Sequence, residues 1–192
     1  FVCTAEFREH YMTEIFDGAG GDGKTYYNLI IDTGCINVGY APHSWKLCSA
    51  MKKVFTEKRG LRLGMTNHKR LLEDNGEKEY ADFPWLIIDE CSMLTEKNKN
   101  QLIDLISGHG KIVFCGDLKC QIIPYDDEPM NYSRIENIAP QSEKNWRFTC
   151  PVQLETCNML RKCIEYDYPF YPKDLPYQKV DEDFVKKNYN HK

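Results

Sequence analysis

Short apolar runs alternate along the chain with longer segments in which apolar residues recur at helical spacing. The short runs are rich in Ile, Val, Phe or Leu and end in Gly, Pro or acidic residues, which predicts buried strands. These strands are expected at residues 14–17, 37–40, 85–89 and 111–115. The longer segments are expected to be helices, at residues 24–33, 43–55, 95–107 and 152–166. Because strands that alternate with helices are typical of βαβ units, we expect an α/β fold with a mostly parallel sheet and helices on both faces.

Length and composition are those of a globular chain. The 192 residues, with 42% hydrophobic and 28% charged content, suffice for one full α/β domain and a little more. No apolar stretch approaches the ~18 residues of a membrane span, so no membrane partner is expected. The chain starts at Phe1 rather than Met, and we interpret it as an excerpt of a longer protein.

The nine cysteines include no C-x-x-C pair, which is the spacing typical of structural zinc. Several lie inside apolar runs, where cysteine behaves as a small buried hydrophobe. We therefore expect reduced thiols in an intracellular protein, cytoplasmic or nuclear, with a viral protein in an infected cell as an alternative.

Charge is unevenly distributed, although the net charge is only −4. Residues 43–70 contain eight Lys or Arg residues and one Glu, which gives +7 over 28 residues. The next stretch, residues 73–90, carries seven acidic residues and one Lys. A basic band beside an acidic one favours a charged groove for nucleic acid, and a solvated surface helix is the alternative.

The strongest motif lies between the first predicted strand and the first predicted helix, and it matches G-x-x-x-x-G-K-[ST]. Glycines let main-chain N–H groups surround phosphate oxygens, and the helix N-terminus adds its positive dipole end. Lys24 would reach the β- and γ-phosphates and the Thr25 hydroxyl would bind magnesium, so ATP and Mg²⁺ are the expected ligands. An acid in a phosphate cradle would repel the phosphates, so we expect Asp22 to point outward. The predicted nucleotide-binding residues are Gly18, Ala19, Gly20, Gly21, Asp22, Gly23, Lys24 and Thr25.

Two adjacent carboxylates stand at the end of the apolar run at 85–89. Asp89 is expected to hold magnesium together with Thr25, and Glu90 is expected to orient and deprotonate the attacking water. These carboxylates come 65 residues after Lys24 in an α/β pattern. That context favours the catalytic interpretation over a strand that simply ends in acids.

A further motif follows the run at 111–115, where Gly116 and Asp117 precede Gln121. A strand adjacent to the one that carries Asp89 would place the Gln121 amide near the γ-phosphate. An ordinary Gly-Asp turn after a buried strand is the alternative.

These three motifs, in this order, resemble those of superfamily 1 helicases, especially the RecD-like branch that includes the Pif-type enzymes. The resemblance extends from about Ile15 to Arg161, most of the chain. It includes segments similar to other motifs of the family, at residues 39–46, 66–72, 89–94, 121–124, 145–147 and 160–161. The resemblance implies a RecA-like P-loop NTPase core. It also implies a motor that hydrolyses ATP to move along single-stranded nucleic acid and to unwind duplexes.

In this family the segments that correspond to 39–46 and 66–72 lie where single-stranded nucleic acid binds. The resemblance therefore implies a strand of nucleic acid as partner, and we expect DNA in preference to RNA. Trp45 would either stack on a base or pack in the core. The residues expected to contact the strand are Pro42, His43, Lys46, Thr66, His68 and Lys69.

The motif around Gln121 departs from the family pattern, which has two residues rather than three between the Asp and the Gln. Cys120 occupies the usual Gln position, so either a one-residue shift or a local bulge is required. The resemblance also implies that Arg147 approaches the γ-phosphate and stabilises transition-state charge.

Two domains are expected in this chain. Residues 1–150 would form the ATP-binding domain, with the segment around Arg147 at its end. Residues 151–192 would begin a second domain or a connector. In superfamily 1 motors ATP lies between two RecA-like domains, so a second such domain of the same polypeptide is an expected partner.

Two other classes of protein remain open. A P-loop kinase would need a lid with arginines and an acceptor pocket, neither of which the sequence shows. A non-hydrolysing regulatory module would keep the fold without the motor. The intact Lys24 and Glu90 argue against that module.

Overall fold

The computed structural model divides the chain into two compact units, Phe1–Arg147 and Phe148–Lys192. The division falls three residues before the boundary expected at residue 150. That the second unit begins another domain stays a prediction. The residues described are 12–26, 37–59, 62–65, 67–73, 85–106, 110–121, 123–124, 127–139, 144–169 and 171.

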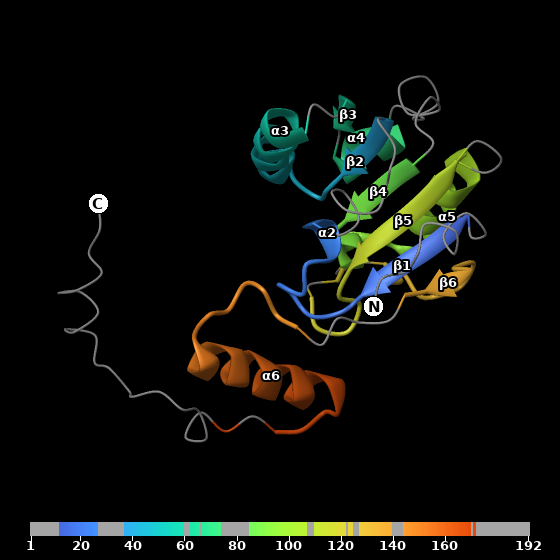
Figure 1. Ribbon diagram of the computed structural model, residues 1–192. Coiled ribbons are helices and arrows are strands. Elements are labelled where there is room, and N and C mark those ends of the chain that lie inside the picture. Colours follow the sequence, from blue (N-terminus) through green and yellow to red (C-terminus); the bar gives the residue numbers. More distant parts are fainter. Residues whose placement is uncertain are drawn as a thin grey trace, which may run out of the picture. The chain divides into compact units, whose positions relative to one another are not determined.

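The first unit is built on a six-stranded sheet with the strand order β3-β2-β4-β5-β1-β6, in which all neighbouring strands are parallel (Figure 1). The strands are β1 (Thr13–Asp17), β2 (Asn37–Ala41), β3 (Arg62–Met65), β4 (Trp85–Asp89), β5 (Lys111–Gly116) and β6 (Asn137–Ile138). The four predicted strands are confirmed to within a residue at each end, whereas β3 and β6 were not predicted.

Five α-helices lie in the described part of the chain. They are α2 (Lys24–Tyr26), α3 (Trp45–Arg59), α4 (His68–Glu73), α5 (Glu96–Ile106) and, in the second unit, α6 (Pro151–Glu165). Four of them correspond to predicted helices, whereas α4 was not predicted. The helix predicted at 24–33 begins at Lys24, and its part beyond Tyr26 lies outside the described residues. The hydroxyl of Thr95 caps α5 by accepting the N–H of Asn98 at 3.1 Å.

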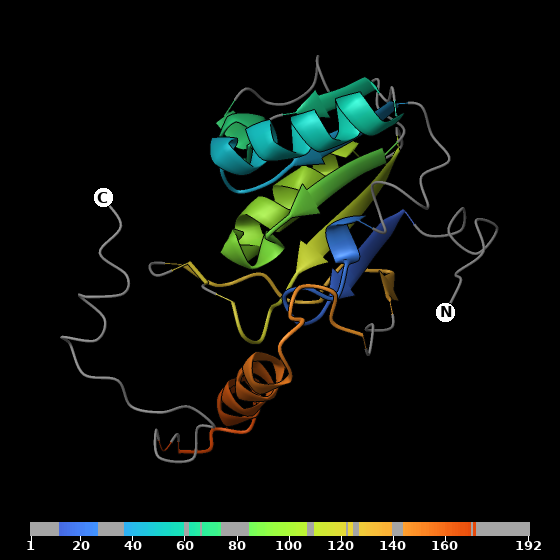
Figure 2. The ribbon, with the colours of Figure 1, turned by 60° about the vertical axis from the view of Figure 1, so that its left-hand side comes forward.

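The core lies on both faces of the sheet, because successive strand residues point to opposite faces. On β4, Leu86 and Ile88 belong to the cluster on one face, whereas Ile87 belongs to the other. The first cluster includes the apolar side of α5 and Leu71 of α4, and the second packs against Met51 of α3. The sheet therefore carries α4 and α5 on one face and α3 on the other (Figures 1 and 2). This confirms the expected α/β fold.

A fully buried cation fixes α5 to the segment that follows β5. The ammonium of Lys99 pairs with Glu96 at 2.8 Å and donates to the main-chain oxygens of Asn131 at 3.0 Å and Ser133 at 2.6 Å. Burial raises the pKa of Glu96, but hydrogen bonds from Lys99 and Ser133 outweigh it and lower this pKa to about 2. The buried ammonium of Lys99 is thus paired, which is the condition for keeping a charge away from water.

Within the described part of the chain, no helix is both long and apolar enough to cross a membrane.

Candidate nucleotide site

Parallel strands bring their carboxyl ends to one edge of the sheet, and most of the predicted site residues lie at this edge. The loop that carries the G-x-x-x-x-G-K-T motif follows β1, while Asp89 ends β4 and Gly116 ends β5. In the strand order β4-β5-β1, the central β5 holds the other two at neighbouring positions. The N–H of Gly18 donates to the carbonyl of Gly116 at 3.0 Å, so the loop starts against the end of β5.

The loop after β1 needs glycine at two positions, because Gly21 and Gly23 have φ values of 92° and 90°. The ammonium of Lys24 folds back over the loop and donates to the carbonyls of Gly18 at 2.6 Å and Ala19 at 2.8 Å. The loop thus holds the lysine beside the main chain where phosphates bind in loops of this kind.

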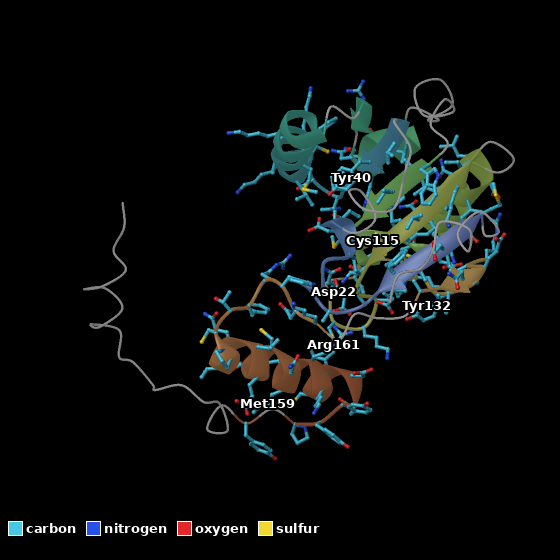
Figure 3. The ribbon with its side chains drawn as sticks, in the orientation of Figure 1. Asp22, Tyr40, Cys115, Tyr132, Met159 and Arg161 are labelled. Atoms are coloured by element: carbon cyan, nitrogen blue, oxygen red, sulfur yellow. The ribbon has the colours of Figure 1, made fainter. Side chains whose placement is uncertain are left out.

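Asp22 points inward, contrary to the expectation from sequence (Figure 3). Its side chain is only 6% exposed, and Oδ1 lies 3.0 Å from the ammonium of Lys24. The same oxygen accepts the main-chain N–H of Lys24 at 3.1 Å, at the start of α2. The ion pair and the helix start both favour this position, and the charge repulsion that would expel the acid arises only when phosphates are present.

Asp89 and Thr25 meet at the end of β4, as predicted. The Thr25 hydroxyl donates to Asp89 Oδ2 at 3.0 Å, and Tyr40 of β2 donates to the same oxygen at 2.7 Å. The N–H of Glu90 donates to the other oxygen, Oδ1, at 3.0 Å. Burial raises the pKa of Asp89, while the hydrogen bonds from Tyr40, Thr25 and Glu90 work against that shift.

Glu90 has a strained main chain, with φ of 55° in the left-handed region that non-glycine residues rarely adopt. The turn that this φ makes begins the short 3-10 helix Cys91–Met93. Burial and the neighbouring charge of Asp89 raise the pKa of Glu90, and His43 lowers it. Strain and a raised carboxylate pKa at one residue are typical of a functional position.

Gln121 reaches the acidic turn despite the extra residue in its motif. Its Oε1 accepts the Ser92 hydroxyl at 3.0 Å and the N–H of Asp117 at 3.1 Å. The extra residue is accommodated in a five-residue turn, closed by the N–H of Gln121 and the carbonyl of Asp117 at 3.1 Å. The side chain that reaches the acidic turn is therefore that of Gln121, and not that of Cys120.

Gly116 allows the turn after β4 to approach the end of β5. A Cβ at Gly116 would lie 2.6 Å from Cys91 Sγ, which is too close for any side chain. The glycine of this motif is thus required for packing.

The segment that ends in Arg147 lies against the phosphate loop. Asn145 donates its side-chain N–H to the carbonyl of Gly20 at 2.9 Å, and the main-chain N–H of Trp146 donates to Gly21 at 2.7 Å. A Cβ at Gly20 would lie 3.4 Å from Arg147 Nη1, and the arginine is exposed. Arg147 is therefore beside the loop, where the resemblance places it.

The residues expected to bind nucleic acid differ in how far they are accessible. Pro42 is buried, and its carbonyl accepts the N–H of His68 at 3.1 Å. His68 is only 4% exposed. Its ring nitrogen Nε2 lies 2.8 Å from the carbonyl oxygen of Asp89. Burial lowers the pKa of His68 to about 4, so the ring is uncharged at neutral pH. This burial contradicts the expectation that His68 contacts the nucleic acid, and its contacts instead connect α4 to the ends of β2 and β4.

The other expected contacts are exposed or lie outside the described residues. His43, Lys46 and Lys69 are exposed, and Thr66 lies outside the described residues. The rings of His43 and His68 meet edge to face, with their centres 5.8 Å apart. Both line a hollow of about 270 Å³ with Lys69, next to the turn that follows Glu90. The structure thus brings exposed His43 and Lys69 to the sheet edge that also carries Asp89 and Glu90.

Magnesium fits this site on the chemistry of its oxygens. The described residues include no group of three His, Cys, Asp or Glu side chains able to hold a metal ion by themselves. Magnesium at phosphate sites needs only one or two protein ligands, because phosphate oxygens and water supply the rest. Thr25 Oγ1 and Asp89 Oδ2, 3.0 Å apart, are two such oxygens.

Sequence reasoning did not identify Tyr40, Ser92 and Trp146 as parts of the site. A tyrosine inside the buried run 37–40 was a usable signal for Tyr40, since a buried hydroxyl needs a partner. Trp146 is 65% exposed, and its Cδ1 would lie 3.4 Å from a Cβ at Gly23. The resemblance of residues 145–147 to a family motif was the usable signal for Trp146, but it gave a role to Arg147 alone.

The comparison with known protein families agrees with this geometry. A family described as "AAA domain" matches residues 5–126, which include β1, the phosphate loop, the acidic turn and Gln121. No curated protein matches the chain. The family covers well over half of the 192 residues, and the parallel sheet, the phosphate loop and the acidic strand end all conform to it. The chain therefore belongs to the AAA domain family and is a P-loop NTPase.

Proposed function

We propose that the chain is the motor domain of a superfamily 1 helicase, which hydrolyses ATP to move along single-stranded nucleic acid and unwind duplexes. The observation that carries the proposal is the shared sheet edge. The ends of β1, β4 and β5 supply the phosphate loop, the acid pair and Gln121, while β2 and α4 supply exposed basic residues. A motor needs both surfaces on one rigid element.

Each side chain at the edge has a role in ATP hydrolysis. Thr25 and Asp89 would hold magnesium, which would supply positive charge to offset that of the phosphates. Lys24 would leave the loop carbonyls and Asp22 for the β- and γ-phosphates. Glu90 would orient and deprotonate the water that attacks the γ-phosphate.

Two further groups would respond to the γ-phosphate. The Gln121 amide is held by Ser92 and the main chain of Asp117, so a shift at the phosphate would pass to the acidic turn. Arg147 would stabilise transition-state charge beside the loop. In this proposal a second RecA-like domain of the same polypeptide closes over the nucleotide.

The nucleic-acid surface continues from His43 onto the exposed face of α3. Trp45 is 48% exposed, and Lys46 and Lys52 are exposed on the same helix. From residue 45 to 53 the helix carries three lysines and no acid. Lysines beside an exposed tryptophan favour the binding of a single strand, through phosphate contacts and base stacking. We propose DNA in preference to RNA as the strand.

A Glu90→Gln variant separates the motor from a module that has lost hydrolysis. The amide keeps the shape of the side chain but cannot take a proton from water. We expect turnover to fall roughly 100-fold or more, with nucleotide affinity within about threefold of the original. Both are measured on the purified protein, by phosphate release and by titration with a fluorescent ATP analogue. Binding without turnover in the unsubstituted protein would identify the non-hydrolysing module. ATP-dependent phosphorylation of a small molecule would identify the kinase.

A further inference from the structure

Tyr40 is a buried residue of β2 with no role in the catalytic chemistry described above. Its side chain is fully buried, and the hydroxyl donates to Asp89 Oδ2 at 2.7 Å. The residue labelled Tyr40 in Figure 3 thus reaches from one strand to the end of its neighbour.

The Asp89 carboxylate is held by donors from three separate elements. Thr25 of α2 and Tyr40 of β2 donate to Oδ2, and the N–H of Glu90 donates to Oδ1. The Thr25 hydroxyl must also serve as a metal ligand, and the N–H of Glu90 belongs to a strained turn. Tyr40 is therefore the donor that has no second task.

The strand that carries Tyr40 cannot easily move. Tyr40 is paired in register with Ile87 of β4 on one side and with Met65 of β3 on the other. A hydroxyl fixed to the interior of a sheet holds its partner at one distance and one angle. Without this donor, the Asp89 carboxylate would still be removed from water but would lose one of the hydrogen bonds that compensate for it. It could also rotate more freely.

We infer that Tyr40 is a positioning residue, which fixes the Asp89 carboxylate in the orientation that binds magnesium and so sets the affinity of the site for the ion. The inference rests on the proposed function, because it concerns the same metal site. Removing a partner that orients a metal-binding carboxylate typically weakens metal binding by about 10- to 100-fold.

The test is a Tyr40→Phe variant, which removes only the hydroxyl. Binding of a fluorescent ATP analogue is titrated with Mg²⁺, and separately measured with the ion chelated. We expect the Mg²⁺ concentration at half-maximal binding to rise roughly 10- to 100-fold. Affinity for the metal-free nucleotide should stay within about twofold, because the phosphate loop is untouched.

Tyr132→Phe is the matched control. Tyr132 also donates its hydroxyl to a carboxylate, that of Asp17, which is not one of the oxygens proposed for the metal. Urea unfolding of each variant establishes that it is folded. If Tyr40→Phe does not fold, Tyr40→Met replaces it in the same titration.

Three results overturn the inference. The first is an unchanged Mg²⁺ midpoint in folded Tyr40→Phe. The second is an equal shift in Tyr132→Phe, which would reveal a general effect of a lost tyrosine–carboxylate bond. The third is nucleotide binding by the unsubstituted protein that does not depend on Mg²⁺. This last result would remove the proposed metal site itself, so the two failures are distinguishable.

Discussion

The ion pair between Asp22 and Lys24 changes the free energy of nucleotide binding. Phosphate must attract the ammonium away from a carboxylate that is nearly fully buried, and the carboxylate then remains close to a polyanion. At an effective dielectric constant between that of water and that of the protein, such repulsion is worth about 1–3 kcal/mol. We therefore interpret Asp22 as a residue that weakens nucleotide affinity.

Asp22→Asn should bind ATP about tenfold more tightly, because the amide oxygen still accepts the N–H of Lys24 while the charge is gone. The dissociation constant is measured by titration with a fluorescent ATP analogue. The control is Asp104→Asn. Asp104 also forms an ion pair, with Arg134 at 2.5 Å, but on the exposed side of α5. Unchanged or weaker binding by Asp22→Asn would contradict this interpretation of the ion pair.

Among single residues, the sequence predicted the chemistry better than the orientation. The motif that contains Lys24 and Thr25 identified the loop, because its residue types are dictated by phosphate. The inward position of Asp22 and the burial of His68 could not be predicted, since both depend on contacts made only in the folded chain. For Gln121, the spacing left a shift or a bulge open, and the turn closed by the N–H of Gln121 and the carbonyl of Asp117 shows that the extra residue is accommodated locally.

Among the elements, α5 depends on its buried lysine. Lys99→Met keeps a similar volume but leaves Glu96 without its cation and the carbonyls of Asn131 and Ser133 without this donor. Removing one partner of a buried ion pair typically destabilises a protein by about 3–5 kcal/mol. We therefore expect the free energy of unfolding to fall by about 3 kcal/mol. Urea unfolding measures it. Lys97→Met, on the exposed side of the same helix, should change it by less than about 0.5 kcal/mol. Equal losses in the two variants would contradict the role given to Lys99.

The long elements were predicted well, and the short ones were not. Runs such as Trp85–Asp89 are apolar on both faces, which is the pattern of a strand buried under helices on each side. The four residues of β3 include a glycine and an arginine, and β6 has only two residues, so neither gives a periodic signal. Both are added to the sheet by pairing with a neighbour rather than by their own sequence.

At the scale of the whole molecule, the strand order explains how one edge would serve the two proposed ligands, the nucleotide and the nucleic acid. The phosphate loop leaves β1 on one side of β5, and the residues that face the proposed strand of nucleic acid leave β2 on the far side of β4. Asp89 lies between them, bonded to Thr25 in one direction and to Tyr40 in the other. In the proposed motor, a change at the nucleotide would reach β2, and the loop after it that carries His43, through these two hydrogen bonds.

The measurement that tests the account most directly is the rate of ATP hydrolysis with and without single-stranded DNA or RNA, in the unsubstituted protein and in Lys24→Ala. We predict hydrolysis that one polymer stimulates at least about tenfold, more by DNA than by RNA, and that Lys24→Ala abolishes. Hydrolysis at the same rate with and without either polymer would contradict the motor, and hydrolysis that survives Lys24→Ala would contradict the site.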